Sequence, residues 1–273
     1  FTQMYAQGLT PNPCVECNRS VKFDHFITQA KKLNCDKVAT GHYAKIIKKN
    51  NEFELHKADY LDKDQSYVLH MLKSSDLENI SFPLGEISKP EVRQIAARIG
   101  LKTAFKKDSQ DICFVGKKDY RSFVEKRIDL TSPGEIFDTE GNKVGDHNGI
   151  HEFTVGQRKG LPGGYGTPRY VTKINVQNKN VTIGEKKDLL VSSFIVEELS
   201  CVNDLEYNNL TIQTRYNSED LPCEIKKLSD TKVLVQLKEP AFGVAPGQFG
   251  VIYNGTKVVC GGRISPKVLE NIG

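Results

Sequence analysis

The chain has 273 residues, of which 38% are hydrophobic and 26% are charged, and its formal net charge is +4 at pH 7. Such values are typical of a globular protein large enough for two or three domains, and no apolar run reaches the roughly 18 residues of a membrane-spanning helix. They exclude an integral helical membrane protein. The opening FTQMYAQGLT lacks the basic and apolar regions of a secretory signal peptide and does not begin with Met, so we expect a fragment of a longer protein.

Seven cysteines stand at irregular spacings. Because secreted disulfide frameworks use an even number of cysteines at recurring spacings, this pattern predicts reduced thiols and a cytoplasmic location. The charge is also uneven, since eight basic residues accompany four acidic ones between residues 102 and 127. That local excess is compatible with attraction for nucleic acid and, equally, with a solvated helix and loop.

The N-terminal part mixes helical and strand-like patterns. In SVKFDHFITQAKKL, residues 20–33, the apolar positions follow helical spacing, so we expect a helix that begins just after Cys17. DKVAT, residues 36–40, predicts a short buried strand. Gly41 and His42 follow at its carboxyl end, where open α/β sheets bind ligands.

Two further elements precede the middle of the chain. KIIKK and FELHKA flank an Asn-Asn pair and predict a β-hairpin. SKPEVRQIAARIG, residues 88–100, predicts a helix in which Ser88 and Glu91 form a capping box and Gly100 ends the last turn.

The second half of the chain is β-rich. After SPG at 132–134, short runs separated by turns predict a small domain, and from about Val191 the runs recur at the close spacing of a sandwich or barrel. We therefore predict an α/β domain over 1–128, a small β-rich central domain over 129–190 and a C-terminal β-barrel over 191–273. GLPGGYG lies between β-like runs, so we interpret it as a loop and not as a phosphate cradle.

Cys14 and Cys17 lie three positions apart in TPNPCVECN. They could form half of a zinc site, but the chain has no second CxxC or HxxxH, so Cys35 or Cys113 with His42 would have to complete it. They could form a redox dithiol, although a rigid PNP turn is not the usual context for one. Alternatively, Cys17 could be a reactive thiol at a helix start, where the helix dipole stabilises a thiolate.

Cys113 is a second candidate for a reactive thiol. In KKDSQDICFVGKK, lysines on both sides would favour its thiolate, and a loop can bring it to a partner site. The other cysteines lie among apolar positions, and we expect them to be small buried hydrophobic residues. They are Cys35, Cys201, Cys223 and Cys260.

Seven segments, in order along the chain, resemble the bacterial tRNA-specific 2-thiouridylase family. They are PNPCVECNRSVKF, VATGHYAKI, DKDQSYVL, FPLGEISKPEVRQIA, KKDSQDICFVG, HEFTVGQRKGLPGG and APGQFGVIYNG. The resemblance implies that residues 1–128 are the C-terminal part of an ATP-pyrophosphatase-type catalytic domain with an adenine-nucleotide alpha-hydrolase-like fold. The family's domain begins with a strand and an ATP-binding SGGVDSS loop, and neither is in this sequence.

The resemblance implies an enzyme that replaces the C2 oxygen of the wobble uridine of tRNA with sulfur. In the family, ATP with Mg²⁺ adenylates that oxygen and a cysteine persulfide delivers the sulfur. Cys17 matches the nucleophile and Cys113 the persulfide carrier; either Cys17 releases hydrogen sulfide, or the two cysteines form a transient disulfide that must be reduced. The implied partners are the tRNA anticodon loop and a sulfur-relay donor protein, and a cytoplasmic monomer with neither a permanent metal nor a membrane contact is expected.

Other positions match nucleotide-binding or tRNA-binding residues of the family. Gly41 would face ATP and His42 would approach the tRNA. The remaining matches to tRNA contacts are Asn12, Pro13 and Cys14 at the target base, Lys63, Asp64 and Gln65, and Arg215, Tyr216 and Gln248. Some members carry Asp at the position of Cys14, where a carboxylate has been suggested as general acid or base, so proton transfer by this side chain is in doubt here.

These matched positions also have purely structural interpretations. His42 could be a strand-end histidine whose hydrogen bonds are satisfied, residues 63–65 could be a helix cap, and Arg215 with Tyr216 could be a solvent-facing β pair. A second function from another class stays open as well. A chain without the phosphate loop and the first strands would not grip ATP, and it would then be a non-catalytic tRNA-binding module.

Overall fold

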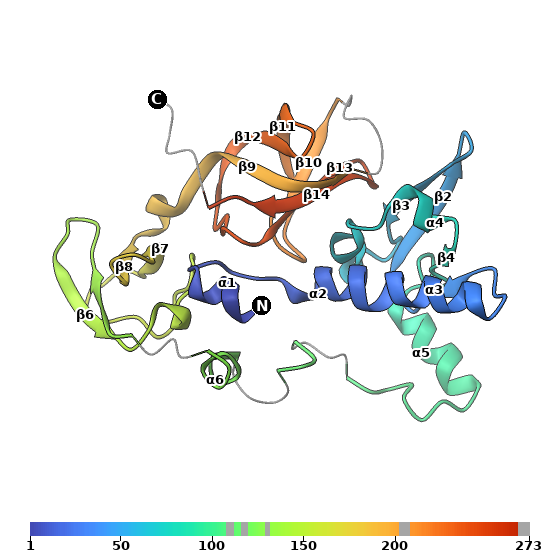
Figure 1. Ribbon diagram of the computed structural model, residues 1–273, viewed down its shortest axis with the longest axis horizontal. Helices are drawn as coiled ribbons and strands as arrows, with labels where there is room; N and C mark the ends of the chain where they lie inside the picture. The colour runs from blue at the N-terminus through green and yellow to red at the C-terminus, as the bar shows by residue number, and fades with distance from the viewer. Residues whose placement is uncertain (108–111, 116–119, 129–131, 202–207, 267–273) are drawn as a thin grey trace.

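The computed structural model describes residues 1–107, 112–115, 120–128, 132–201 and 208–266 (Figure 1). Its α/β part, small central sheet and barrel follow one another along the chain, which confirms the predicted fold class. The domain ends proposed at residues 128 and 190 remain predictions. None of the described helices is both long and apolar enough to cross a membrane.

The chain opens with a short helix and then a long helical run, drawn in blue in Figure 1. The run changes from α-helix to π-helix and back without a break. Its elements, after α1 (Thr2–Ala6), are α2 (Pro13–Glu16), η1 (Cys17–Phe23) and α3 (Asp24–Lys32).

The prediction that this helix begins after Cys17 is wrong. It begins at Pro13, because Asn12 Oδ1 accepts a hydrogen bond from Cys14 N at 3.2 Å and proline suits the first helical positions. Cys14 therefore lies in the first turn, and Cys17 opens the π-helical segment. Such segments are rare in proteins and are frequent at functional sites.

The rest of the α/β part is built from short elements. β1 (Val38–Ala39) pairs in parallel with β4 (Ile80–Ser81), as expected for a strand that ends before Gly41. Short helical turns connect the segments between them. These are η2 (Leu61–Lys63), η3 (Ser66–Leu69) and α4 (Ser74–Leu77).

Two predictions for this part are confirmed. The hairpin forms from β2 (Ala44–Lys49) and β3 (Glu52–Lys57), with Asn50 and Asn51 at φ of 48° and 66°, values that asparagine tolerates well. The later helix, α5 (Lys89–Arg98), has the expected capping box.

The central sheet has four strands in the order β6-β5-β8-β7. Its strands are β5 (Gly134–Phe137), β6 (Lys143–His147), β7 (Tyr170–Asn175) and β8 (Asn180–Gly184). The turn η4 (Ile150–Glu152) and the helix α6 (Tyr120–Glu125) lie beside it. Inward-facing Ile136, Val171 and Val181 are at most 2% exposed and form its small core.

Six strands close into the predicted barrel, because β13 pairs with both β10 and β14. After the turn η5 (Lys186–Leu189), the strands are β9 (Leu190–Cys201), β10 (Leu210–Gln213), β11 (Leu221–Ser229), β12 (Lys232–Phe242), β13 (Phe249–Asn254) and β14 (Lys257–Ile264). The β2–β3 hairpin joins the same sheet through β14, so the barrel is continuous with the α/β part.

The α/β part and the barrel also share one hydrophobic core. Val15 and Phe23 of the long helical run belong to the same buried cluster as Phe249 and Tyr253 of β13. The hydroxyl of Tyr67, a buried residue of η3, donates to Phe249 O at 2.8 Å. The position of the cysteine-bearing helix is thus fixed against the barrel.

Candidate active site

The CxxC cysteines lie at the accessible start of the long helical run. Cys14 is exposed and Cys17 is partly buried. Positions three apart on a helix are neighbours, so the two thiols share one side of the helix. Glu16 forms ion pairs with Arg19 at 2.9 Å and with Arg263 of β14 at 3.3 Å, which ties this turn to the barrel.

Cys113 lies in the turn 112–115, which packs beside α1. The neighbouring Phe114 meets Phe1 edge to face at 5.2 Å between ring centroids. Partial burial raises the pKa of the Cys14 thiol, although the residue reaches the surface. The charges of Cys113 and Cys17 raise this pKa further. Two cysteines distant from each other in the sequence thus both act on the Cys14 thiol.

His42 belongs to the same neighbourhood. Burial, and to a smaller extent the charge of Lys22, together lower its pKa to about 4. The charge of Lys22 also offsets part of the rise in the pKa of Cys14, so it acts on both the histidine and this thiol. His42 Nδ1 is 2.8 Å from Thr40 Oγ1, and its ring packs against Phe23. The imidazole is therefore neutral at pH 7 and satisfied on one side.

Cys14, Cys17, Cys35, Cys113 and Cys223 are free thiols. Cys223 and Cys260 are buried in the barrel core, as predicted. The expectation for Cys35 is wrong: it is exposed, because the helix ends at Lys32 and the chain turns outward through Asn34 at a φ of 55°. The side chain of Cys201 lies outside the described residues.

The described residues include one group that could hold a metal ion. Glu125, His151 and Glu152 place a possible ligand atom each within 4.8 Å of one another, and His151 Nε2 is 3.2 Å from Glu125 Oε1. Cys14 and Cys17 are not members of any such group in the described part of the chain. The arrangement of the thiols therefore gives no support to the zinc interpretation.

Gly41 stands at the carboxyl end of β1, where it is exposed. A Cβ at this position would meet only Leu84 Cδ1, at the ordinary contact distance of 3.6 Å. The backbone here is open to a ligand at the strand end, which is the position where α/β sheets bind nucleotides. The residues present fit a bound nucleotide at this edge.

The segment Lys63–Gln65 is mostly built into the protein. Asp64 is buried and accepts hydrogen bonds from Ala58 N at 2.8 Å and from Ser66 Oγ at 2.6 Å, while burial raises its pKa. Gln65 Oε1 accepts from Tyr43 N at 3.0 Å. Two of the three residues predicted to contact tRNA, Asp64 and Gln65, thus accept hydrogen bonds from other groups of the protein. Lys63 is partly exposed beside them.

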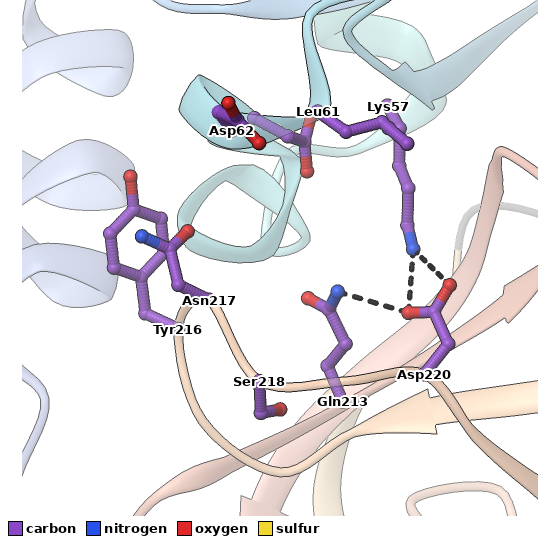
Figure 2. Close-up of a pocket in the computed structure, with 9 residues that line it drawn as sticks. Lys57, Leu61, Asp62, Gln213, Tyr216, Asn217, Ser218 and Asp220 are labelled. Carbon is purple, nitrogen blue, oxygen red and sulfur yellow. Dashed lines mark hydrogen bonds and ion pairs between the residues drawn. The ribbon is translucent and has the colours of Figure 1, made fainter.

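A polar pocket of about 470 Å³ lies between this segment and the β10–β11 loop of the barrel. Figure 2 shows Lys57 directed at Asp220, with both Nζ–Oδ distances at 2.6 Å, and Gln213 Nε2 donating to the same carboxylate at 3.0 Å. Tyr216 lines another side of the pocket. Sequence reasoning missed Lys57 and Asp220; the one usable signal was a lysine at an inward position of β3.

Arg215 lies half-buried beside this pocket, against glycines of two other segments. A Cβ on Gly243 would lie 2.9 Å from its Nη2, and a Cβ on Gly156 would lie 3.1 Å from it. No carboxylate pairs with its guanidinium among the residues that the structure describes. Burial lowers the pKa of Arg215, but an arginine stays charged at neutral pH.

Gln248 follows a turn of the barrel that contacts the segment leading into Asn12, where Thr10 N donates to Pro246 O at 3.0 Å. Of the predicted contact residues, Asn12, Pro13 and Cys14 therefore stand at the start of the cysteine-bearing helix, and Asp64 and Tyr216 line the polar pocket. Lys63 and Gln65 flank Asp64 in the chain, and Arg215 precedes Tyr216.

Comparison with known families matches the chain in three pieces. Residues 1–117 match the tRNA methyl transferase HUP domain, residues 121–185 the tRNA methyl transferase PRC-barrel domain, and residues 191–264 the aminomethyltransferase beta-barrel domain.

Three curated proteins illustrate the similarity to full sequences, and all three bear the name tRNA-specific 2-thiouridylase MnmA. The protein of Chloroflexus aurantiacus is 42% identical over 270 residues, which cover 97% of this chain and 75% of that protein. The protein of Rickettsia prowazekii is 41% identical, with 98% and 76% covered, and that of Geobacter metallireducens is 39% identical, with 99% and 74% covered.

Proposed function

The chain belongs to the tRNA-specific 2-thiouridylase MnmA family, and we propose that it acts as a tRNA-uridine 2-sulfurtransferase. The proposed reaction is the ATP-dependent transfer of persulfide sulfur to C2 of the wobble uridine, which yields 2-thiouridine. The observation that carries the proposal is the 42% identity to a tRNA-specific 2-thiouridylase over 97% of the chain, and the free thiols of Cys17 and Cys113 support it.

The thiols would carry the sulfur. A donor protein would load Cys113 as a persulfide, and the Cys17 thiolate would attack the inner sulfur of that persulfide. This forms the Cys17–Cys113 disulfide and releases hydrosulfide, which attacks the activated C2 carbon. A thiol reductant must then supply two electrons to restore both cysteines, so each turnover consumes one persulfide and one reducing pair.

ATP with Mg²⁺ would supply the adenylyl group that turns the C2 oxygen into a leaving group. The exposed strand-end backbone at Gly41 would hold the nucleotide. We infer no resident metal. The protein is proposed to work as a cytoplasmic monomer with the tRNA anticodon loop and a sulfur-relay donor as its partners.

The target base would rest against the turn before the helix. Asn12 and Pro13 are fixed by the cap and by the proline ring, so this turn presents Cys14 and Cys17 in a defined orientation. His42 approaches as a neutral imidazole, because its lowered pKa of about 4 keeps it uncharged at pH 7. Its role is therefore to hydrogen-bond or pack, not to pair with a phosphate.

The test replaces single cysteines in a strain whose only gene copy carries the change, and measures 2-thiouridine in digested tRNA by mass spectrometry. We expect Cys17→Ser and Cys113→Ser each to abolish 2-thiouridine, and the exposed Cys35→Ser to leave it unchanged. Normal thiolation in the Cys113→Ser strain would overturn the assignment of the persulfide carrier.

A second candidate is a tRNA-binding module without catalysis. The small size of the described parallel sheet favours it, since β1 and β4 pair over only two residues each. Binding assays on the chain distinguish the two functions. Binding of both ATP and tRNA supports the enzyme, and binding of tRNA without ATP supports the module.

A further inference from the structure

The glycine-rich loop of the central sheet has no part in the sulfur chemistry proposed above. Its residues 158–169 connect the segment after η4 to β7. They enclose an open cavity of about 340 Å³ whose lining includes Arg158, Tyr165, Arg169 and three glycines. The loop therefore combines a concave backbone with two guanidinium groups.

The glycines leave the concave side open. A Cβ on Gly163, Gly164 or Gly166 would meet nothing within 4 Å. Gly164 and Gly166 have φ values of 102° and 66°, which favour glycine. Among the described residues, none accepts a backbone hydrogen bond from the N–H groups of residues 163–167. No neighbouring protein atom therefore requires glycine at these three positions. We infer that their lack of a side chain leaves the backbone open to an incoming group.

The two arginines are held differently. Arg169 is partly buried, stacks over the Tyr165 ring at 4.8 Å and lies 3.5 Å from Glu185, so its guanidinium is positioned in advance. Glu185 also pairs with Lys187 at 3.1 Å, so one carboxylate serves two cations. Arg158 is exposed. The local charge of the loop therefore stays positive.

The base of the loop adjoins the predicted RNA-binding position on the barrel. Gln157 holds this base, because its Oε1 accepts from Thr154 N and its Nε2 donates to Lys159 O, both at 3.0 Å. Gly156 in the same turn faces the guanidinium of Arg215. Arg158 follows Gly156 by two positions, so basic groups continue from the barrel onto the central sheet.

Against the sequence-based interpretation of GLPGGYG as no phosphate cradle, we propose that the loop 158–169 is a phosphate-binding site for the RNA backbone, which extends the tRNA-binding surface from Arg215 onto the central sheet. The proposal rests on the proposed function in one respect, namely that the chain binds tRNA. Arg158 and Arg169 bind phosphate oxygens through charge-assisted hydrogen bonds, and the open backbone N–H groups of the glycines complete the site. The interaction is independent of base sequence.

The test measures the binding of unmodified tRNA to the full chain over a series of salt concentrations. Arg158→Gln with Arg169→Gln should weaken binding about tenfold and flatten the slope of log K against log salt by roughly 0.7 to 0.9 for each phosphate that the variant no longer binds. Lys143→Gln is the matched control: it removes a central-sheet cation that Glu135 and Asp146 already neutralise at 2.8 Å, and it should leave both quantities unchanged.

The outcomes separate the inference from the proposed function. If the unchanged chain fails to bind tRNA, the proposed function is overturned, and the inference with it. If the chain binds tRNA and the double variant keeps its affinity and salt slope, the inference alone is overturned. An equal loss in Lys143→Gln also overturns it, because only the net charge of the central sheet would then matter. Coincident thermal unfolding of all variants shows that each is folded.

Discussion

The polar pocket next to the β10–β11 loop and the thiol site, which consists of Cys14, Cys17 and Cys113, differ in how many protein partners their side chains have. At the pocket, Asp64, Lys57 and Asp220 each have hydrogen-bond or ion-pair partners in the protein. At the thiol site, Cys14, Cys17 and Cys113 are free. The pocket is therefore a structural junction that fixes the barrel against the α/β part, whereas the thiols stand available for chemistry.

The largest expected difference between the two regions is in stability. Asp64→Ala removes an acceptor from Ala58 N and Ser66 Oγ in a buried site, so we expect the free energy of unfolding to fall by about 3 kcal/mol. Urea denaturation measures this value. Cys17→Ser, at the thiol site, should change it by less than about 1 kcal/mol. Equal decreases in the free energy of unfolding for the two variants would contradict the contrast between a structural pocket and a thiol site that contributes little to stability.

The packing of η3 against the barrel should also be sensitive to acid, because His70, next to η3, packs against Phe249 of β13. His70 is fully buried, and burial lowers its pKa to about 4, below that of an unfolded histidine. The unfolded chain thus binds the proton first, so stability is complete above the unfolded pKa and falls as the pH drops towards about 4. From pH 7.5 to pH 5 we expect a loss of about 2 kcal/mol from this group.

The matched variant for the acid effect is His70→Gln, compared with the unchanged chain by urea denaturation at both pH values. Removing the titratable ring should shrink the difference in unfolding free energy between the two pH values. An unchanged difference would show that His70 does not titrate as described, and the acid sensitivity would then belong to another group.

The smallest expected effect is at Cys14. We expect Cys14→Ala to leave the 2-thiouridine content of tRNA unchanged, because the proposed transfer uses only Cys17 and Cys113. Mass spectrometry of digested tRNA measures it, with Cys35→Ala as the control at another exposed cysteine. A loss as complete as that expected for Cys17→Ser would instead give Cys14 an essential part.

Local sequence signals predicted most of the elements. The capping box at Ser88 and Glu91 and the Asn50–Asn51 turn are short-range features, and both are present. Period-two runs in the C-terminal third likewise predicted strands. The closure of the barrel, and the addition of the β2–β3 hairpin to it, depend on long-range pairing that no local pattern encodes.

Sequence reasoning was weaker at the site. The helix start was misplaced because the spacing of apolar residues begins after Cys17, whereas the first turn is set by Asn12 and Pro13. The ion pair of Lys57 with Asp220 joins two distant segments, so neither residue carries a signal for its partner. Likewise, nothing in the sequence around Asp64 and Gln65 shows that their side chains accept hydrogen bonds from the backbone of other segments.

Disulfide trapping shows whether Cys17 and Cys113 work as a pair. The Cys14→Ala chain is incubated with oxidised glutathione, which accepts two electrons as two protein thiols become a disulfide, and the linked peptides are identified by mass spectrometry. We expect a Cys17–Cys113 crosslink as the main product. Glutathione adducts on Cys113 without that crosslink, or a crosslink from Cys113 to Cys35, would contradict it.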